Sequence, residues 1–186
     1  MNYHDYIWDL GGTLLDNYEI STQAFVETLA TFGVIAEHDA VYAKLKESTA
    51  AAIAYFIPKT PSFLETYKKN EAKHLENPLL FKGSKEILEK IVQSGGRNFL
   101  VSHRNAQVLS LLEVTGILPY FTEVVTSESG FARKPSPESM LYLKNKYQID
   151  SGLVIGDREI DRQAGQAAGF ETLLVDGSVS LMEIVK

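Results

Sequence analysis

Short apolar runs and segments of helical periodicity alternate through most of this chain. The runs that predict buried strands, because they are short and bounded by turn residues, are 6–8, 98–101, 123–126, 153–155 and 172–175. Segments where apolar residues recur at helical spacing predict amphipathic helices over 84–93, 106–114, 160–168 and 179–185. One more helix is expected to begin at Ser136-Pro137, with the serine as its cap and the proline in its first position.

The segment 16–80 follows a different pattern, because it contains no strand signal. Apolar residues at helical spacing predict helices over 20–32, 39–47 and 50–57. Thr60-Pro61 predicts the cap and first position of a fourth helix that runs towards Leu75. We therefore expect an α/β protein whose Rossmann-like parallel sheet, covered by helices on both faces, comes from residues 1–15 and 81–186. Residues 16–80 form a small all-helical insertion in this scheme.

Composition narrows the class of protein. A chain of 186 residues with 45% hydrophobic and 23% charged residues can build a core of one domain with an insertion. Its net charge of −6 argues against a nucleic-acid partner. The lack of cysteine excludes disulfides, thiolate metal sites and cysteine nucleophiles. No apolar run reaches the about 20 residues of a membrane helix, and the N-terminus does not resemble a signal peptide, so we expect a soluble cytoplasmic protein.

Charged or polar side chains follow the predicted strands at their carboxyl ends. Asp9 and Ser102 come directly after a strand, Gly156-Asp157 ends a third, Lys134 lies in the loop after another, and Asp161 follows Asp157 by four residues. Ligands of parallel sheets bind beyond the carboxyl ends of the strands, so we expect these residues to share one cleft. Three carboxylates gather there only if cations offset their charge. A divalent metal and a lysine would do so, and such a site suits transfer of a phosphoryl group.

The first predicted strand leads into the candidate nucleophile. The Asp9 carboxylate can accept a phosphoryl group and form an aspartyl phosphate. Gly11 and Gly12 allow backbone amides to approach phosphate oxygens, and Thr13 adds a hydroxyl donor. A strand that ends in a surface aspartate and a Gly-Gly turn is the structural alternative.

The later segments supply the other candidate ligands. Ser102 and the adjacent His103 are candidates for contact with a phosphoryl oxygen, although a serine after a strand is also a common helix cap. Lys134 lies in a loop stiffened by two prolines and is a candidate partner of Asp9 and of the phosphoryl group. Asp157 and Asp161 are candidate Mg²⁺ ligands, Asp161 directly or through water. An acidic residue in a first helical turn is equally explained by the helix dipole.

Taken together, these strings resemble the haloacid dehalogenase-like hydrolase superfamily, in the branch with a small helical cap inserted after the first strand. The matching strings are Asp9-Leu10-Gly11-Gly12-Thr13-Leu14, Leu100-Val101-Ser102, Lys134-Pro135-Ser136-Pro137 and Gly156-Asp157-Arg158-Glu159-Ile160-Asp161. The resemblance implies a Mg²⁺-dependent phosphatase with Asp9 as nucleophile. It also implies that Ser102 and Lys134 hold the phosphoryl group, that Asp157 binds the metal, and that the helical insertion closes over a small phosphorylated substrate.

Gly11 departs from the family pattern. Phosphatases of the family usually carry an aspartate there, which protonates the leaving group and whose backbone carbonyl binds the metal. Glycine keeps the carbonyl and loses the acid. Three outcomes are open: a leaving group that needs little protonation, as in acyl phosphates or anhydrides; a substitute acid, with His103 the first candidate and His4 the second; or lost turnover.

The functional expectation is a Mg²⁺-dependent hydrolase of a small phosphorylated metabolite. The alternatives are a weak or inactive phosphate-ligand binder and a phosphonatase-type C–P hydrolase. The latter uses a cap lysine as a Schiff base, and none of the lysines of the insertion can be matched to that role: Lys44, Lys46, Lys59, Lys68, Lys69 and Lys73. Dehalogenases do not usually carry the acidic string at 156–161, and sugar-phosphate mutases of the family depend on the aspartate that Gly11 replaces.

Overall fold

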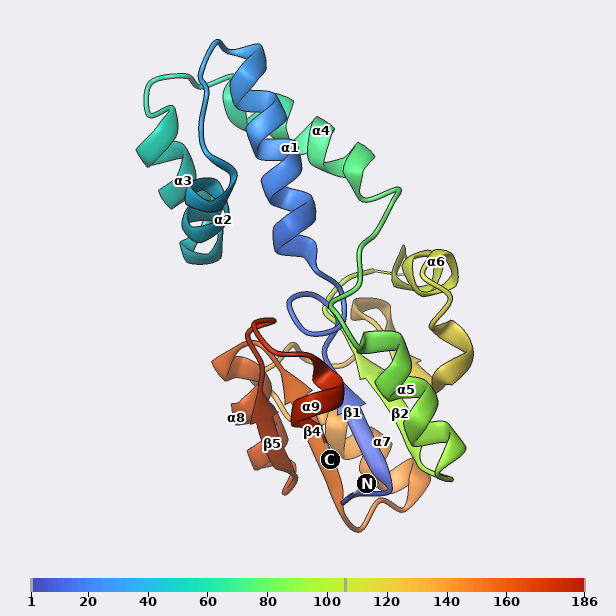
Figure 1. Ribbon diagram of the computed structural model, residues 1–186. Helices are drawn as coiled ribbons and strands as arrows, with labels where there is room; N and C mark the ends of the chain where they lie inside the picture. Colours follow the sequence, from blue (N-terminus) through green and yellow to red (C-terminus); the bar gives the residue numbers. More distant parts are fainter. Residues whose placement is uncertain (1, 106, 186) are drawn as a thin grey trace. The chain divides into compact units, whose positions relative to one another are not determined.

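The computed structural model describes residues 2–105 and 107–185, and the chain within it divides into two compact units (Figure 1). Met1–Leu15 and Leu80–Lys186 make up the larger unit, called here the core unit. Asp16–Leu79 make up the smaller one, called here the helical unit. Among the described residues, each helix is too short or too polar to span a lipid bilayer.

The core unit is built on a five-stranded sheet of strand order β3-β2-β1-β4-β5, in which every neighbouring pair is parallel. This arrangement confirms the expected Rossmann-like α/β fold. Its strands are β1 (Asp5–Trp8), β2 (Arg97–Val101), β3 (Phe121–Val125), β4 (Gly152–Gly156) and β5 (Glu171–Leu174). Its helices are α5 (Ser84–Gln93), α6 (Gln107–Val114), η1 (Leu118–Tyr120), η2 (Ser127–Ser129), α7 (Glu138–Tyr147), α8 (Glu159–Ala167) and α9 (Leu181–Ile184).

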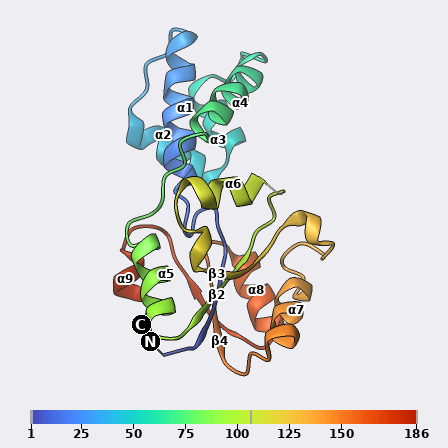
Figure 2. The same ribbon diagram turned by 90° about the vertical axis from the view of Figure 1, so that its right-hand side faces the viewer.

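Helices cover both faces of this sheet, α7 and α8 one face and α5 and α9 the other (Figure 2). Successive strand residues point to opposite faces, so Ile7, Phe99 and Val154 join one apolar cluster with residues of α7 and α8. On the opposite face the buried Trp8 Nε1 donates to Asn98 Oδ1 at 3.0 Å. The Asn98 amide in turn donates to the Leu88 carbonyl of α5 at 3.1 Å. The central strands are therefore buried on both sides, which explains their nearly continuous apolar sequence.

The helical unit contains α1 (Asn17–Thr31), α2 (His38–Glu47), α3 (Thr49–Phe56) and α4 (Phe63–His74). Its core is aromatic: the Phe25 ring lies 4.9 Å from that of Phe63 and 5.0 Å from that of Tyr67, both edge-on. Ser21 of α1 and Tyr67 of α4 both donate hydrogen bonds to the Glu71 carboxylate, at 2.6 and 2.7 Å. The unit thus has a core and a polar network of its own.

Several predicted helix ends differ from the observed ones, and local hydrogen bonds explain why. Helix α1 begins at Asn17, before the first apolar position, because the Asp16 side chain accepts from the Glu19 N–H. The prediction for Thr60-Pro61 is wrong: both precede α4, and the Phe63 N–H donates to the Thr60 carbonyl in a turn. Helix α7 begins one residue later than expected, after Pro137. The predicted start of α6 at Ala106 lies outside the described residues.

Candidate active site

Three candidate residues lie at the same edge of the sheet because each follows the last residue of a parallel strand. Asp9 follows β1, and its N–H donates to the Ile155 carbonyl of β4 at 2.8 Å. Ser102 follows β2, and its N–H donates to the Val125 carbonyl of β3 at 2.9 Å. Asp157 follows β4. The hydrogen-bonded backbone of the sheet therefore fixes the backbone positions of these three residues.

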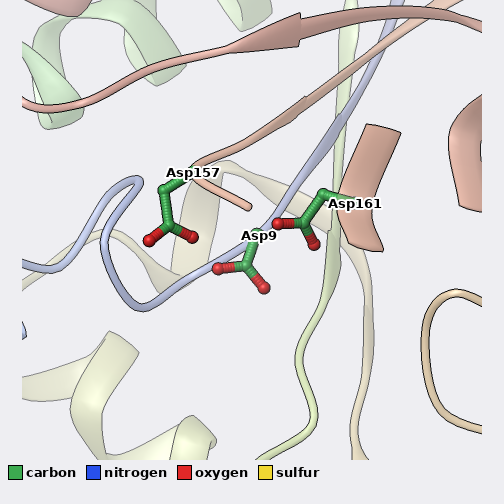
Figure 3. Close-up of side chains that lie close together, drawn as sticks. All are labelled: Asp9, Asp157 and Asp161. Carbon is green, nitrogen blue, oxygen red and sulfur yellow. The ribbon is translucent and has the colours of Figure 1, made fainter. Parts of the chain in front are cut away.

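Three carboxylates meet at this edge. Ligand oxygens of Asp9, Asp157 and Asp161 all lie within 4.8 Å of one another. Asp161 comes from the first turn of α8 and is only 2% exposed. Figure 3 shows the carboxylates of Asp157 and Asp161 on either side of that of Asp9. These oxygens and their spacing fit a small hard divalent cation, which prefers carboxylate ligands.

Lys134 supplies the positive charge of the site. Its Nζ donates to Asp9 Oδ1 and to Asp161 Oδ1, both at 2.5 Å, and to the Val101 carbonyl at 3.2 Å. These contacts use all three donors of the ammonium group. Burial opposes the charge of Lys134, but the attraction of the two aspartates outweighs it and raises the pKa of Lys134. Burial also raises the pKa of Asp9, and the charge of Lys134 offsets only part of that rise.

Asp161 serves two partners at once. Its Oδ1 accepts from Lys134, and its Oδ2 accepts from the Arg158 N–H at the start of α8, at 3.1 Å. It is therefore both a cap of its helix and an anchor for the lysine. The structure brings it beside the other two carboxylates, but its oxygens are already held within the protein.

Two glycines allow the carboxylates to approach so closely. A Cβ at Gly12 would lie 2.1 Å from Asp157 Oδ2, and a Cβ at Gly156 would lie 2.4 Å from the Asp161 Cβ. Gly12 also has a φ of +85°, which disfavours any other residue. Sequence reasoning missed the role of Gly156 and of the Val101 carbonyl. A glycine directly before an aspartate at a strand end was the available signal for Gly156.

Gly11 differs from Gly12, since its φ lies outside the positive region. It forms an isolated bridge with Leu15. The backbone therefore does not require glycine at this position. Among the described residues, none forms a hydrogen bond with the buried Thr13 hydroxyl, which follows in the same loop.

His103 holds the loop that carries Lys134. Its Nε2 accepts the Lys134 backbone N–H at 2.7 Å, so in the neutral ring the proton lies on Nδ1. Burial, with the charges of Lys134, Arg133 and Arg158, lowers the pKa of His103 to about 4, against the opposing effect of Asp161. The imidazole is therefore neutral near pH 7.

The remaining candidates lie in different places. Ser102 and His103 line a pocket of about 280 Å³ at the ends of β2 and β3, together with Arg133. The Ser102 hydroxyl also accepts the Arg104 N–H at 3.2 Å. His4 precedes β1 and contacts Asp5, so it lies at the opposite end of the sheet from Asp9.

Comparison with known proteins relates this arrangement to a large group of enzymes. Residues 6–175 match the family model described as haloacid dehalogenase-like hydrolase. A crystal structure of a hydrolase from Streptococcus pneumoniae TIGR4 is 64% identical, with a TM-score of 0.94 over 99% of this chain and 97% of that one. A phosphoglycolate phosphatase of Aquifex aeolicus is 28% identical over 90% of this chain and 82% of its own. Pyrophosphatase PpaX of Bacillus velezensis is 26% identical over 89% and 80%.

The Gly12 contact predicts a variant that separates cation binding from backbone strain. Gly95 has a φ of +84°, close to that of Gly12, but a Cβ there would meet nothing within 4 Å. Gly95→Ala should therefore cost about 1–2 kcal/mol of stability from its left-handed conformation alone. Gly12→Ala should carry a similar cost and also displace the Asp157 carboxylate. Mg²⁺ should raise the unfolding temperature of the wild type and of Gly95→Ala, but not that of Gly12→Ala.

Equal stabilisation of both variants by Mg²⁺ would show that Asp157 is not needed to bind the ion.

The lowered pKa of His103 predicts a pH effect on stability. Between its ordinary value of 6.5 and about 4, the unfolded chain binds a proton that the folded chain does not. The free energy of unfolding should therefore fall as the pH drops through this window. His103→Gln keeps an acceptor for the Lys134 N–H but does not titrate, so this part of the pH dependence should disappear. Urea unfolding at pH 7, 5.5 and 4.5 measures it, and identical pH profiles for the two proteins would contradict the assignment.

Proposed function

The chain belongs to the haloacid dehalogenase-like hydrolase family, and we propose that it is a phosphatase of a small phosphorylated metabolite with Asp9 as its nucleophile. The observation that carries the proposal is the Lys134 ammonium, which bridges Asp9 and Asp161 at the carboxyl edge of the sheet. An ammonium so placed can hold a phosphoryl group against the carboxylate that attacks it. The similarity to a phosphoglycolate phosphatase and to a pyrophosphatase, over 90% and 89% of this chain, supports hydrolysis of a phosphoryl bond.

Mg²⁺ is the cofactor of this proposal. Asp9, Asp157 and the backbone carbonyl of Gly11 would hold it, with Asp161 in contact through water. Bound there, the ion neutralises negative charge on the phosphoryl group and the carboxylates. The spacing of the three carboxylates and the space left by Gly12 support this assignment.

The side chains around Asp9 have separate roles in this proposal. Lys134 pairs with Asp9, and its positive charge attracts the phosphoryl group. Ser102 and Thr13 donate hydrogen bonds to phosphoryl oxygens, whereas the Gly12 N–H, expected from the sequence to do the same, donates to the Leu15 carbonyl at 2.9 Å. His103 acts as a positioning residue, because its contact with the Lys134 N–H holds the loop that presents the ammonium.

A second function, binding of a phosphorylated ligand without turnover, is favoured by one observation. Gly11 provides no acid or base next to the nucleophile, and positioned acid–base catalysis is typically worth about 10²–10⁴-fold. Assays of turnover and of binding distinguish the two functions.

The phosphatase proposal predicts that hydrolysis depends on Asp9 and on a divalent cation. In a panel of acyl and alkyl phosphates, at least one compound should release phosphate with Mg²⁺, and this release should stop with EDTA. Asp9→Asn preserves size but removes the nucleophile, so turnover of every substrate should vanish. Asp150→Asn, an exposed change before β4, is the matched control and should keep wild-type activity.

Ligand binding without turnover of any compound would overturn the phosphatase assignment in favour of the binder.

The missing side chain at position 11 predicts that the aspartyl phosphate decays slowly. Water that attacks this intermediate lacks a base from Gly11, so phosphorylated protein should accumulate in a burst. Gly11→Asp should speed its decay by about 10²–10⁴-fold. Rapid quenching followed by intact-mass measurement detects the phosphorylated protein. Single-turnover data without any accumulation would refute this version of the mechanism.

A further inference from the structure

From the groups that surround Asp9 we infer that this enzyme selects substrates whose leaving group departs as a stable anion, namely acyl phosphates and phosphoanhydrides. The inference rests on the proposed function and narrows its substrate class. It decides between two open possibilities, a substitute acid at His103 and a leaving group that needs no acid. The deciding observations are the side-chain contacts of the core unit.

The first observation is that the proton-bearing groups around Asp9 are already engaged. Lys134 directs its three donors to Asp9, Asp161 and the Val101 carbonyl. Asp161 accepts hydrogen bonds on both oxygens and is buried. Gly11 has no side chain. Within the described part of the core unit, none of these residues is placed to give a proton to a departing oxygen.

The second observation concerns His103. Its Nε2 accepts a backbone hydrogen bond at 2.7 Å, so that atom has no proton to give. Only the Nδ1 proton of a neutral imidazole remains, and a neutral imidazole is a very weak acid. The pKa of about 4 agrees with this geometry, since protonated His103 would be scarce at neutral pH. His103 therefore does not replace the missing acid.

The chemistry of the first step follows from these contacts. An Asp9 oxygen attacks phosphorus and forms a new P–O bond, while the bond from phosphorus to the leaving oxygen breaks. The leaving oxygen keeps the electron pair. A carboxylate or a phosphate is stable in that form, and no proton is required. An alkyl ester would expel an alkoxide, which needs a proton as the bond breaks.

The second step returns the enzyme to its starting state. Water attacks the aspartyl phosphate, the P–O bond to Asp9 breaks, and its electron pair returns to the carboxylate. The product is hydrogen phosphate, and the second water proton passes to solvent. This step does not involve the leaving group, so it does not affect the choice between substrates.

The experiment measures how kcat/KM depends on the leaving group. This ratio covers the steps up to the first irreversible one, so slow decay of the intermediate does not disturb it. Similar-sized aryl phosphates, from 4-nitrophenyl to phenyl to 4-methoxyphenyl phosphate, give a slope against leaving-group pKa. Acetyl phosphate and glycerol 3-phosphate extend the range. We expect a steep fall in the wild type, with glycerol 3-phosphate the poorest substrate.

Two variants at position 11 provide the matched comparison. Gly11→Asp restores an acid at a position whose φ is not left-handed, so it should flatten the slope and raise kcat/KM for glycerol 3-phosphate by about 10²–10⁴-fold. Gly11→Asn has nearly the same size but no acidic proton, and should keep the steep slope. Circular dichroism and unfolding temperatures establish that both variants are folded.

A flat slope in the wild type would overturn the inference, because it would reveal a proton donor elsewhere in the chain. Equal flattening by Gly11→Asn and Gly11→Asp would also overturn it. If the wild type turned over none of these substrates, acetyl phosphate included, the proposed function would be overturned and this inference with it. A flat slope with Asp9-dependent turnover leaves the phosphatase assignment intact, so the two failures are distinguishable.

Discussion

The contact of the Lys134 ammonium with Asp9 and Asp161 is the interaction on which the candidate site depends. Three carboxylates within 4.8 Å of one another would repel strongly at a sheet edge of low polarity. A buried charge is tolerated when it is paired and when its hydrogen bonds are satisfied. Lys134 meets both conditions, since its side chain is 3% exposed and its donors reach two aspartates and a backbone carbonyl. The same pairing holds the Asp9 carboxylate at the end of β1.

That contact in turn depends on supports that carry no charge themselves. Gly156 makes room for the Asp161 side chain, and Gly12 makes room for the carboxylate of Asp157. The His103 ring fixes the backbone of Lys134 through a single hydrogen bond. Each support lies on a different strand end or loop of the core unit, so the parallel sheet is what aligns them. A loss of any one of them would move a charged group, which explains why stability and cation binding are expected to change together.

Because of Gly11, the site combines residues for phosphoryl binding and attack with the lack of a side-chain acid at this position. The groups that would hold and attack a phosphoryl group are in place, whereas the side chain that would protonate the leaving group is missing. The φ of Gly11 lies outside the left-handed region, so its backbone conformation does not by itself require glycine. In the proposed mechanism the substrate compensates for the missing acid, because its leaving group departs without a proton. Similarity to both a phosphoglycolate phosphatase and a pyrophosphatase does not decide between the two kinds of leaving group.

The pattern of apolar runs was sufficient to predict the strands, the parallel sheet and the position of Asp9, Ser102 and Asp157 after strand ends. It was sufficient because the apolar character of a segment and the spacing of its apolar residues are local properties of a sequence. It failed at Thr60-Pro61, where a turn competes with a helix cap and both are compatible with the same residues. The pairing of Lys134 with Asp161 and the contact of His103 with the Lys134 backbone came only from the tertiary structure. These contacts join residues far apart in the chain, and their geometry is set by the strand order β3-β2-β1-β4-β5 and by side-chain packing, which no local pattern encodes.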